Sequence, residues 1–519
     1  MTMKRKGGIW DARYLVVAIG WIAAGAARAD DVVKADNTDA LNLASSWVGG
    51  TVPGPFDTAV WNNTVTASNS VALGADLSWY GIRITNPGGL VTINPGNTLS
   101  LGAGGLDLSS AVQDFRLFAT TVVAASQTWN IADGRTVTLD NKSSANFSST
   151  HNLTIEGGGT IHIGEANLQN VHVLTIERGV LRTGNRAQWS TTALRINGAG
   201  QFKVASFGGS ISNFTVGSGG ITLTQPAAGA FTPIEWLYGS SATRRAVMNL
   251  NGDLTFVGHA DNTEPAVVNV NAATGTFGDG PFLLSGARNF VIGDGGAEVD
   301  LVFKPRLGGN GSLVKQGPGT LELQGIGDNI YTGGTTVEAG TLLVTNTTGS
   351  GTGTGAVMVK GGAVLGGTGI ITGATTIEDD GELAPGASVG TLTVGTLAMN
   401  DTSKLSFDLG TPWQYTGGER SSPNDLVVVD GDLSLDGRLY VSALSGFNEG
   451  IYTLFVYTGA LTDKTLEVTA MPGSYMGMVE IDELSQAVNL RVIPEPTGLV
   501  SMAVVLVGLW ALRRRATRP

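Results

Sequence analysis

The sequence predicts an all-β solenoid, and three observations support this fold class. Short triplets of alternating residues recur about every 20 residues, glycine is abundant, and helical periodicity is missing from the body of the chain. Glycine accounts for 76 of the 519 residues, about twice its usual share of roughly 7%. Because proline is ordinary in number and no Gly-X-Y period occurs, we interpret the glycines as turns between short strands.

Two interleaved series of triplets define the predicted coil. The first comprises Leu153-Thr154-Ile155, Leu174-Thr175-Ile176, Leu194-Arg195-Ile196 and Phe214-Thr215-Val216. The second follows it by six to eight residues and comprises Ile161-His162-Ile163, Val180-Leu181-Arg182, Phe202-Lys203-Val204 and Ile221-Thr222-Leu223. This pattern predicts two short strands in each coil of about 20 residues, with a core made continuous by stacking. Strand alternation places Leu153 and Ile155 inward and Thr154 outward.

Similar strands continue to about residue 344, although their spacing loosens to about 23 residues. A β-sandwich array is the alternative, because short strands separated by turn signals also fit that architecture. The regular recurrence favours coils over sandwiches.

Charge and cysteine content narrow the class of protein. The net charge of −12 becomes −20 when residues 1–29, which carry +4, and the four arginines after Leu512 are set aside. An acidic body of this kind disfavours nucleic acid and anionic lipid as partners. Cysteine is absent, so the fold is held without disulfides.

The first 29 residues have the three parts of a secretory signal peptide. Basic residues 4–6 precede an apolar stretch at 14–27, and Ala27 and Ala29 form an A-x-A cleavage site. The mature chain is therefore expected to begin at Asp30, after signal peptidase has acted.

The last residues predict a short membrane anchor. The uncharged stretch 498–512 makes a helix of about 23 Å at 1.5 Å per residue, shorter than a bilayer core of about 30 Å. Arg513, Arg514 and Arg515 follow it, and the positive-inside rule places the upstream body on the far side of the membrane. Pro494 and Pro496 keep Glu495 extended and accessible.

These parts, in this order, resemble the PEP-CTERM sorting signal of Gram-negative bacteria. The resemblance implies that an exosortase recognises Pro494, Glu495 and Pro496 and cleaves there. The apolar helix is then a transient anchor in the inner membrane, and the processed protein reaches the cell surface or the extracellular space. A plain single-span anchor with a chance Pro-Glu-Pro is the alternative.

A second resemblance lies within the predicted coils. Residues 311–323 (GSLVKQGPGTLEL) and 331–342 (YTGGTTVEAGTL) resemble the autotransporter-associated β-strand repeat, which we place at about 309–346. Residues 365–369 and 383–392 are similar to the next elements of such passengers. The resemblance implies a right-handed parallel β-helix at the cell surface. Gly334 and Gly386 suit the positive φ of tight coil corners.

Composition divides the chain into five parts. Residues 1–29 are the signal peptide, and 30–80 form an N-terminal cap rich in aromatic residues, including Trp47, Trp61 and Trp79. The β-helix occupies 81–410. A C-terminal β cap at 411–490 begins with a loop or linker at 411–423, and the sorting tail is 491–519.

Three groups of residues carry possible chemistry, and we predict that none is a catalytic, cofactor or metal site. Residues 386–390 fit the pattern G-x-S-x-G around Ser388, but the nucleophile elbow requires a turn from strand to helix. His151, His162 and His172 alternate between faces of a coil of about 20 residues. The acidic run 378–382 lacks the nonapeptide of calcium-binding β-rolls.

The sequence therefore favours a noncatalytic protein of the cell surface or matrix, acting in adhesion or in association with exopolysaccharide or a biofilm. Other envelope components are possible partners. A polysaccharide lyase or glycoside hydrolase on the same scaffold is the alternative. No recurring pair of carboxylates supports it, since such a pair must supply the acid and the base.

Overall fold

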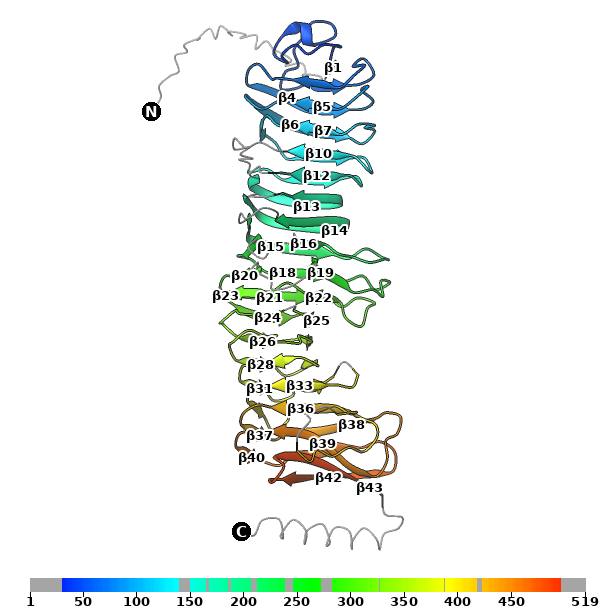
Figure 1. Cartoon of the computed structure of the whole chain (residues 1–519), viewed down its shortest axis with the longest axis vertical. Coiled ribbons are helices and arrows are strands. Elements are labelled where there is room, and N and C mark those ends of the chain that lie inside the picture. The colour runs from blue at the N-terminus through cyan, green and yellow to red at the C-terminus, as the bar shows by residue number, and fades with distance from the viewer. Residues whose placement is uncertain are drawn as a thin grey trace, which may run out of the picture.

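A computed structural model describes residues 30–139, 150–164, 168–184, 188–206, 212–238, 246–271, 282–325, 327–386, 388–417 and 422–495. Apart from one short 3₁₀ turn, η1 (Ala44–Ser46), the regular structure of these residues is entirely β-strand. The strands stack one above another along a single long axis (Figure 1). None of the described residues forms a helix long and apolar enough to cross a bilayer. The predicted signal peptide and the apolar stretch 498–512 lie outside the described residues.

Neighbouring strands are paired in parallel, each with the equivalent strand of the next coil. Leu153 pairs with Leu174, and Leu174 pairs with Leu194, in parallel register. A β-sandwich is built from antiparallel sheets packed face to face, so that alternative is wrong. The fold is a parallel β-solenoid, and its strands form three columns that run the length of the molecule.

The first column contains one strand from nearly every coil. Its members are β1 (Asp31–Val33), β2 (Thr58–Trp61), β4 (Leu77–Ile84), β6 (Thr98–Leu108), β9 (Gln127–Ile131), β11 (Leu153–Glu156), β13 (Leu168–Thr183), β14 (Gln188–Ser206), β15 (Ser212–Thr224), β18 (Leu254–Val257), β21 (Ala287–Ile292), β24 (Ser312–Gln316), β26 (Thr335–Val337), β28 (Val357–Val359), β31 (Thr375–Ile377), β34 (Leu397–Met399), β37 (Leu433–Leu435) and β40 (Leu461–Asp463).

The second column runs beside the first and shares the long strands β13 and β14 with it. Its other members are β3 (Asn69–Val71), β5 (Val91–Ile93), β7 (Phe115–Leu117), β10 (Thr136–Leu139), β12 (Thr160–Ile163), β16 (Ile234–Tyr238), β19 (Ala266–Asn271), β22 (Leu301–Phe303), β25 (Thr320–Leu323), β27 (Gly340–Val344), β29 (Ala363–Gly367), β32 (Glu382–Pro385), β35 (Lys404–Leu409), β38 (Arg438–Ala443) and β41 (Glu467–Ala470).

The third column includes the N-terminal parts of β4, β6, β13, β14 and β15. Its separate strands are β8 (Thr120–Val123), β17 (Ala246–Leu250), β20 (Phe282–Leu284), β23 (Leu307–Gly309), β30 (Ile370–Ile371), β33 (Thr391–Val394), β36 (Leu426–Val429) and β39 (Gly450–Tyr457). Two antiparallel strands, β43 (Ala487–Pro494) and β42 (Tyr475–Asp482), continue from β39.

The third column corrects the predicted coil, which had two strands. The register of the first three triplets in each series is confirmed, but the fourth is wrong in both. Leu194 stacks on Ile221, and Phe202 stacks on Ile234. The triplet at Phe214 belongs to the third column, where it pairs with Trp189 and Met248. A third strand lengthens the coil here, so constant spacing selects the wrong partner.

One apolar core fills the interior between the columns. Leu153 and Ile155 are buried and Thr154 is partly exposed, as alternation predicts. The same alternation recurs along the chain, and the buried side chains form one continuous cluster. Tight corners separate the strands, and both Gly334 (φ +85°) and Gly386 (φ +88°) adopt the positive φ that was expected.

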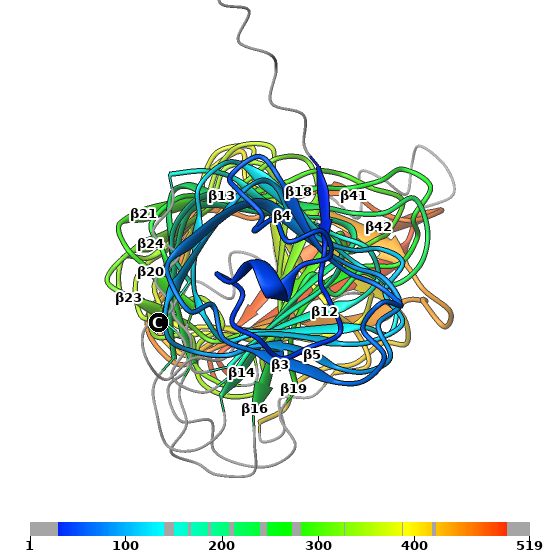
Figure 2. The ribbon, with the colours of Figure 1, turned by 90° about the horizontal axis from the view of Figure 1, so that it is seen from above.

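Aromatic packing occupies the N-terminal end of the solenoid. Trp47 lies 5.8 Å from both Trp61 and Trp79 between ring centroids, in edge-to-face contact. The short helical ribbon of η1, which precedes Trp47, lies across the centre of the ring of strands in the view down the long axis (Figure 2). The strands β1, β2 and β4 already stack in parallel here, so the first coils lie within residues 30–84.

At the opposite end, parallel stacking continues well beyond residue 411. Strands β37 and β40 extend the first column, and β38 and β41 extend the second. Antiparallel pairing is confined to β39, β43 and β42. Side chains near this hairpin, including Val468, Met471, Tyr475 and Val479, pack against the core. The last coils thus resemble those before them, and the hairpin is the irregular element.

Candidate binding surfaces

Ser388 of the G-x-S-x-G segment does not occupy a nucleophile elbow. It is exposed in a bend, and the segment leads into the strand β33 (Thr391–Val394) rather than into a helix. Gly386 turns the chain with a positive φ, and the N–H of Gly390 donates a hydrogen bond to Asp425 Oδ1 at 2.9 Å. The turn is therefore a coil corner that is secured by a carboxylate.

Asp425 is the side chain that secures this corner. Its Oδ2 accepts a hydrogen bond from the N–H of Asp408 at 2.7 Å, and its side chain is buried. Burial raises the pKa of Asp425 to about 7, although the two N–H donors favour the charged form. Raised pKa values are common among catalytic acids, but this carboxyl group points at backbone N–H groups inside the wall. It acts on the corner and not on a substrate.

The three histidines lie on two different columns. The N–H of His172 donates to the carbonyl oxygen of His151 at 3.1 Å, so these residues stack in adjacent coils. His162 lies in the second column and pairs with Thr138 and Arg182. Within the described residues, no group of three or more histidine or acidic side chains is placed to hold a metal ion.

The acidic run 378–382 is distributed along a coil corner. Glu378 accepts a hydrogen bond from Lys360 Nζ at 2.8 Å, and Glu382 accepts one from Ser406 Oγ at 2.7 Å. Each of these carboxylates contacts a neighbouring coil. Their polar partners explain the acidic run as part of the scaffold.

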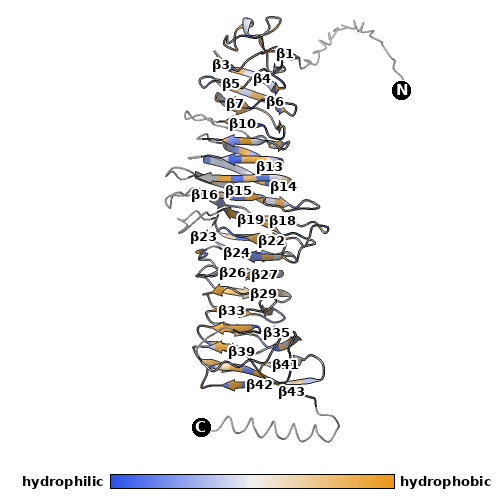
Figure 3. Ribbon diagram, turned by 45° about the vertical axis from the view of Figure 1, so that its right-hand side comes forward, coloured by the Kyte–Doolittle hydropathy of each residue, from blue (hydrophilic) through white to orange (hydrophobic). Residues whose placement is uncertain are grey.

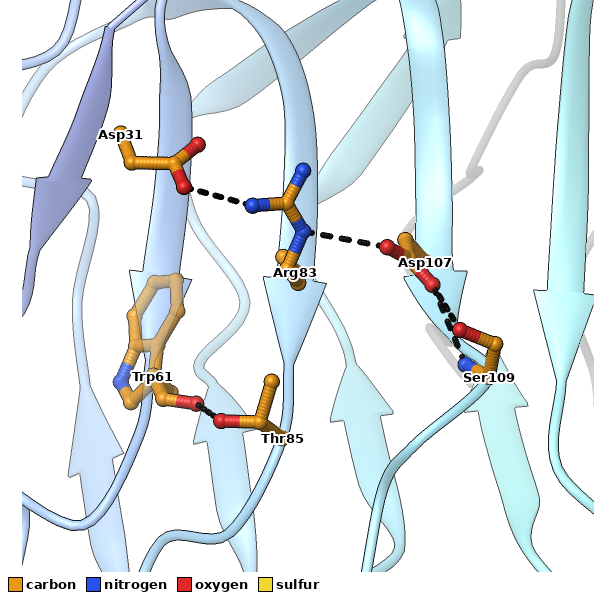
Figure 4. A network of polar contacts seen from close by, with 6 residues as sticks. All are labelled: Asp31, Trp61, Arg83, Thr85, Asp107 and Ser109. Atoms are coloured by element: carbon orange, nitrogen blue, oxygen red, sulfur yellow. Dashed lines mark hydrogen bonds and ion pairs between the residues drawn. The ribbon is translucent and has the colours of Figure 1, made fainter.

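Two carboxylates flank an arginine on the outer face near the N-terminal end (Figure 4). Arg83 contacts Asp31 Oδ2 at 2.6 Å through Nη1 and Asp107 Oδ2 at 3.0 Å through Nε. Burial alone raises the pKa of Asp107, but hydrogen bonds from Ser109 and Arg83 outweigh it and hold the pKa below its ordinary value. A general acid needs a raised pKa, so this arrangement is an ion-paired clasp between coils.

A cleft of about 550 Å³ lies beside the third column. The segment that was predicted as a linker lines it, through Trp413, Gln414, Tyr415, Thr416, Gly417, Ser422 and Pro423. The ring centroids of Trp413 and Tyr415 are 6.5 Å apart. Both rings pack over an apolar patch on the outer wall, formed by Leu426, Val428 and Val456.

Backbone contacts hold this segment against the wall. The N–H of Thr453 donates to the Trp413 carbonyl at 3.0 Å, and the N–H of Tyr415 donates to Thr453 Oγ1 at 2.8 Å. The described lining residues carry no carboxylate, so they offer no acid and base pair for glycan cleavage. Aromatic faces beside amide and hydroxyl groups suit binding of a small polar ligand. The sequence gave no sign of this, beyond two aromatic residues in a polar stretch.

Only part of the predicted sorting motif is described. Pro494 ends β43, and both Pro494 and Glu495 are exposed. The N–H of Glu495 donates a hydrogen bond to the carbonyl oxygen of Ser474 at 2.8 Å. Pro496 and Arg513 to Arg515 lie outside the described residues, as do Ala27 and Ala29 at the predicted leader cleavage site; Asp30 is the first residue described.

Comparison with known proteins supports the resemblance in the coils. The passenger-associated-transport-repeat family matches residues 313–344. The chain carries a passenger repeat. A stretch of 198 residues is also 32% identical to the adhesin BmaC autotransporter of Brucella suis biovar 1 (strain 1330). That alignment covers 37% of this chain and 6% of the adhesin, so the chain spans a small part of the relative that it matches.

The passenger repeat corresponds to two successive coils, β24 with β25 and β26 with β27. Lys315, within the repeat, is fully buried, and its Nζ donates to the carbonyl oxygens of Gln316, Gly317 and Ala339 at 3.2, 2.9 and 2.8 Å. Burial lowers the pKa of Lys315 to about 8. Because Ala339 belongs to the next coil, the lysine joins the two coils of the passenger repeat.

Proposed function

We propose that this protein is an exported, noncatalytic β-helix that acts at the cell surface or in the extracellular matrix. Its role is adhesion or association with exopolysaccharide. The observation that carries the proposal is the passenger repeat within an uninterrupted parallel stack. The similarity to a protein named as an adhesin autotransporter supports the same function.

The outer surface supports a binding role rather than a catalytic one. The acidic groups of the G-x-S-x-G corner and of the Arg83 clasp serve the scaffold, through backbone N–H groups and an ion pair. A long stack presents a large and regular surface to a partner. Binding through such a surface needs no reactive group.

The proposed export route uses both ends of the chain. Signal peptidase removes residues 1–29, and an exosortase recognises Pro494, Glu495 and Pro496 while the tail holds the protein in the inner membrane. Exposure of Pro494 and Glu495 at the end of β43 supports this route, because a processing enzyme needs an accessible extended segment.

Substitution of the central glutamate tests the route. We expect Glu495→Gln to accumulate in the membrane fraction as a larger, unprocessed form, seen by immunoblotting of fractionated cells. The exposed Glu483→Gln is the matched control, because it removes the same charge outside the motif. A Glu495→Gln protein of unchanged mature size and location contradicts the proposed sorting.

Incubation with exopolysaccharide from the host strain tests the binding role. We expect the purified protein to be pulled down with the polymer and to generate no new chain ends over the same period. New reducing or unsaturated ends would instead support the lyase or hydrolase alternative. Failure of the protein to bind either the polymer or whole cells would oppose the surface role.

A further inference from the structure

Four basic side chains form a line on the outer face of the second column. Arg116 of β7 pairs with Thr138 of β10, and Thr138 pairs with His162 of β12. His162 pairs with Arg182 of β13, which pairs with Lys203 of β14. We call Arg116, His162, Arg182 and Lys203 the basic column.

These side chains point away from the core. His162 lies between the buried Ile161 and Ile163, and Lys203 lies between the buried Phe202 and Val204. Alternation therefore directs the basic side chains to the outside. The hydrophilic positions of β13 and β14 are visible among the apolar ones in Figure 3.

The basic column differs in charge pattern from other charged contacts between coils. Arg83 lies between two aspartates, and Lys360 contacts Glu378. In the basic column, Arg182 stacks directly on Lys203, with a spacing of about 4.8 Å between paired strands. Like charges directly opposite each other are destabilising. Such an arrangement costs stability without improving the scaffold, which points to an external anion.

The surroundings of the basic column leave it open to a linear ligand. The adjacent outward positions of the same strands are uncharged: Thr136, Thr160, Val180 and Gln201. A carboxylate joins the line at Glu235, whose Oε2 lies 3.3 Å from Lys203 Nζ. The positive stretch is thus bounded at Lys203 and extends along the axis towards Arg116.

The spacing favours a polymer with regularly repeated negative charges. Guanidinium groups bind carboxylates through paired hydrogen bonds, and coils repeat at about the length of one sugar ring. The remaining acidic body repels a broad polyanion such as nucleic acid. At physiological salt this repulsion is screened beyond about 8 Å, so a narrow chain on the basic column is affected least.

We propose that the basic column binds a carboxylated polysaccharide, laid along the long axis of the molecule with its carboxylates beside Arg116, His162, Arg182 and Lys203. This inference rests on the proposed surface function and names the class of polymer that it engages. It adds a second binding surface to the cleft at Trp413 and Tyr415, on a different column.

Binding of the full-length protein to alginate, a polymer of uronates, tests the inference. The neutral polymer made by amidating the alginate carboxylates serves as the comparison. We expect Arg182→Gln/Lys203→Gln to weaken alginate binding about tenfold or more, since charge-assisted hydrogen bonds are lost. Arg195→Gln/Lys404→Gln is the matched control, because it removes the same charge from outward positions elsewhere. Binding is measured by biolayer interferometry in low salt without divalent cations.

A variant with the opposite expected effect guards against misfolding. Glu235→Gln removes the carboxylate that competes for Lys203, so it should tighten alginate binding. A folding defect cannot produce that gain. Equal losses in the two double variants, or equal binding of amidated alginate, would overturn the inference.

Two further outcomes separate this inference from the surface function on which it rests. Single-stranded DNA that binds as tightly as alginate, with the same dependence on Arg182 and Lys203, contradicts the assignment to polysaccharide. Binding of host exopolysaccharide that is indifferent to both residues leaves the surface role standing and rejects the basic column as its site.

Discussion

Buried ionisable side chains fasten individual coils of this protein. Lys315 uses its amine to satisfy three carbonyl oxygens, and Asp425 uses its carboxyl group to accept two backbone N–H groups. An unpaired polar backbone group inside the wall costs about 1–3 kcal/mol, so each side chain stabilises a corner that strands alone leave unsatisfied. Neither role was foreseen, because a lone lysine or aspartate in the sequence does not reveal its burial.

Asp425 should make stability depend on pH. Its pKa is about 7 in the folded protein and 3.8 by reference, so the folded state holds the extra proton between these values. The free energy of unfolding therefore falls as the pH rises from 4 towards 7. In urea unfolding from pH 5 to pH 8, we expect Asp425→Asn to gain on the wild type by on the order of 2 kcal/mol.

The exposed Asp401→Asn is the control for this titration, because it removes a carboxyl group from a nearby turn. Its difference from the wild type should stay nearly constant with pH. If the Asp425→Asn difference is equally constant, the carboxyl group at position 425 does not hold a proton at neutral pH.

At the scale of the strands, prediction succeeded where coils are short. The stacking of Leu153, Leu174 and Leu194 is confirmed because about 20 residues separate each pair. It fails at Phe214, where a strand of the third column takes the expected position. Period alone cannot tell which of three walls a triplet joins, since all three walls alternate in the same way.

Corner glycines offer a test at this scale. Gly334 and Gly362 share a positive φ, of +85° and +82°, but a Cβ at Gly334 would lie 2.7 Å from the carbonyl oxygen of Ala356, and one at Gly362 would meet nothing within 4 Å. We expect Gly362→Ala to cost about 1 kcal/mol, through backbone strain alone. Gly334→Ala should cost more and lower the thermal midpoint further. Equal midpoints would mean that the corner relaxes.

For the whole molecule, repetition predicts tolerance to the removal of complete coils. Thr335 pairs with Val357, 22 residues further on. Deleting residues 335–356 brings Val357 onto the strand that Thr335 covered, so the columns stay continuous. We expect this deletion to retain its far-ultraviolet circular dichroism per residue and to unfold at a similar temperature.

Deleting residues 335–345 instead removes β26 and β27 while leaving the turn that follows them. The neighbouring strands then lose their partners, and we expect a lower midpoint or aggregation. If both deletions are equally harmful, the coils are not interchangeable units.

The sequence predicted the class of fold and the passenger repeat, but not the surfaces that make contact with partners. The basic column draws one side chain from each of several coils, so it exists only once the strand register is known. Trp413 and Tyr415 were assigned to a linker because nothing local to them indicates the apolar patch that they cover. The sorting motif remains a prediction from the sequence.

The parallel columns also determine how the molecule would respond to pulling. Strands lie across the long axis, so the hydrogen bonds between coils lie along it (Figure 1). Tension between a tethered end and a bound partner therefore loads few of these bonds at a time. Coils detach in succession, and 22 residues release roughly 70 Å of chain. A protein built in this way extends under load in steps and lengthens its tether before the contact at its surface gives way.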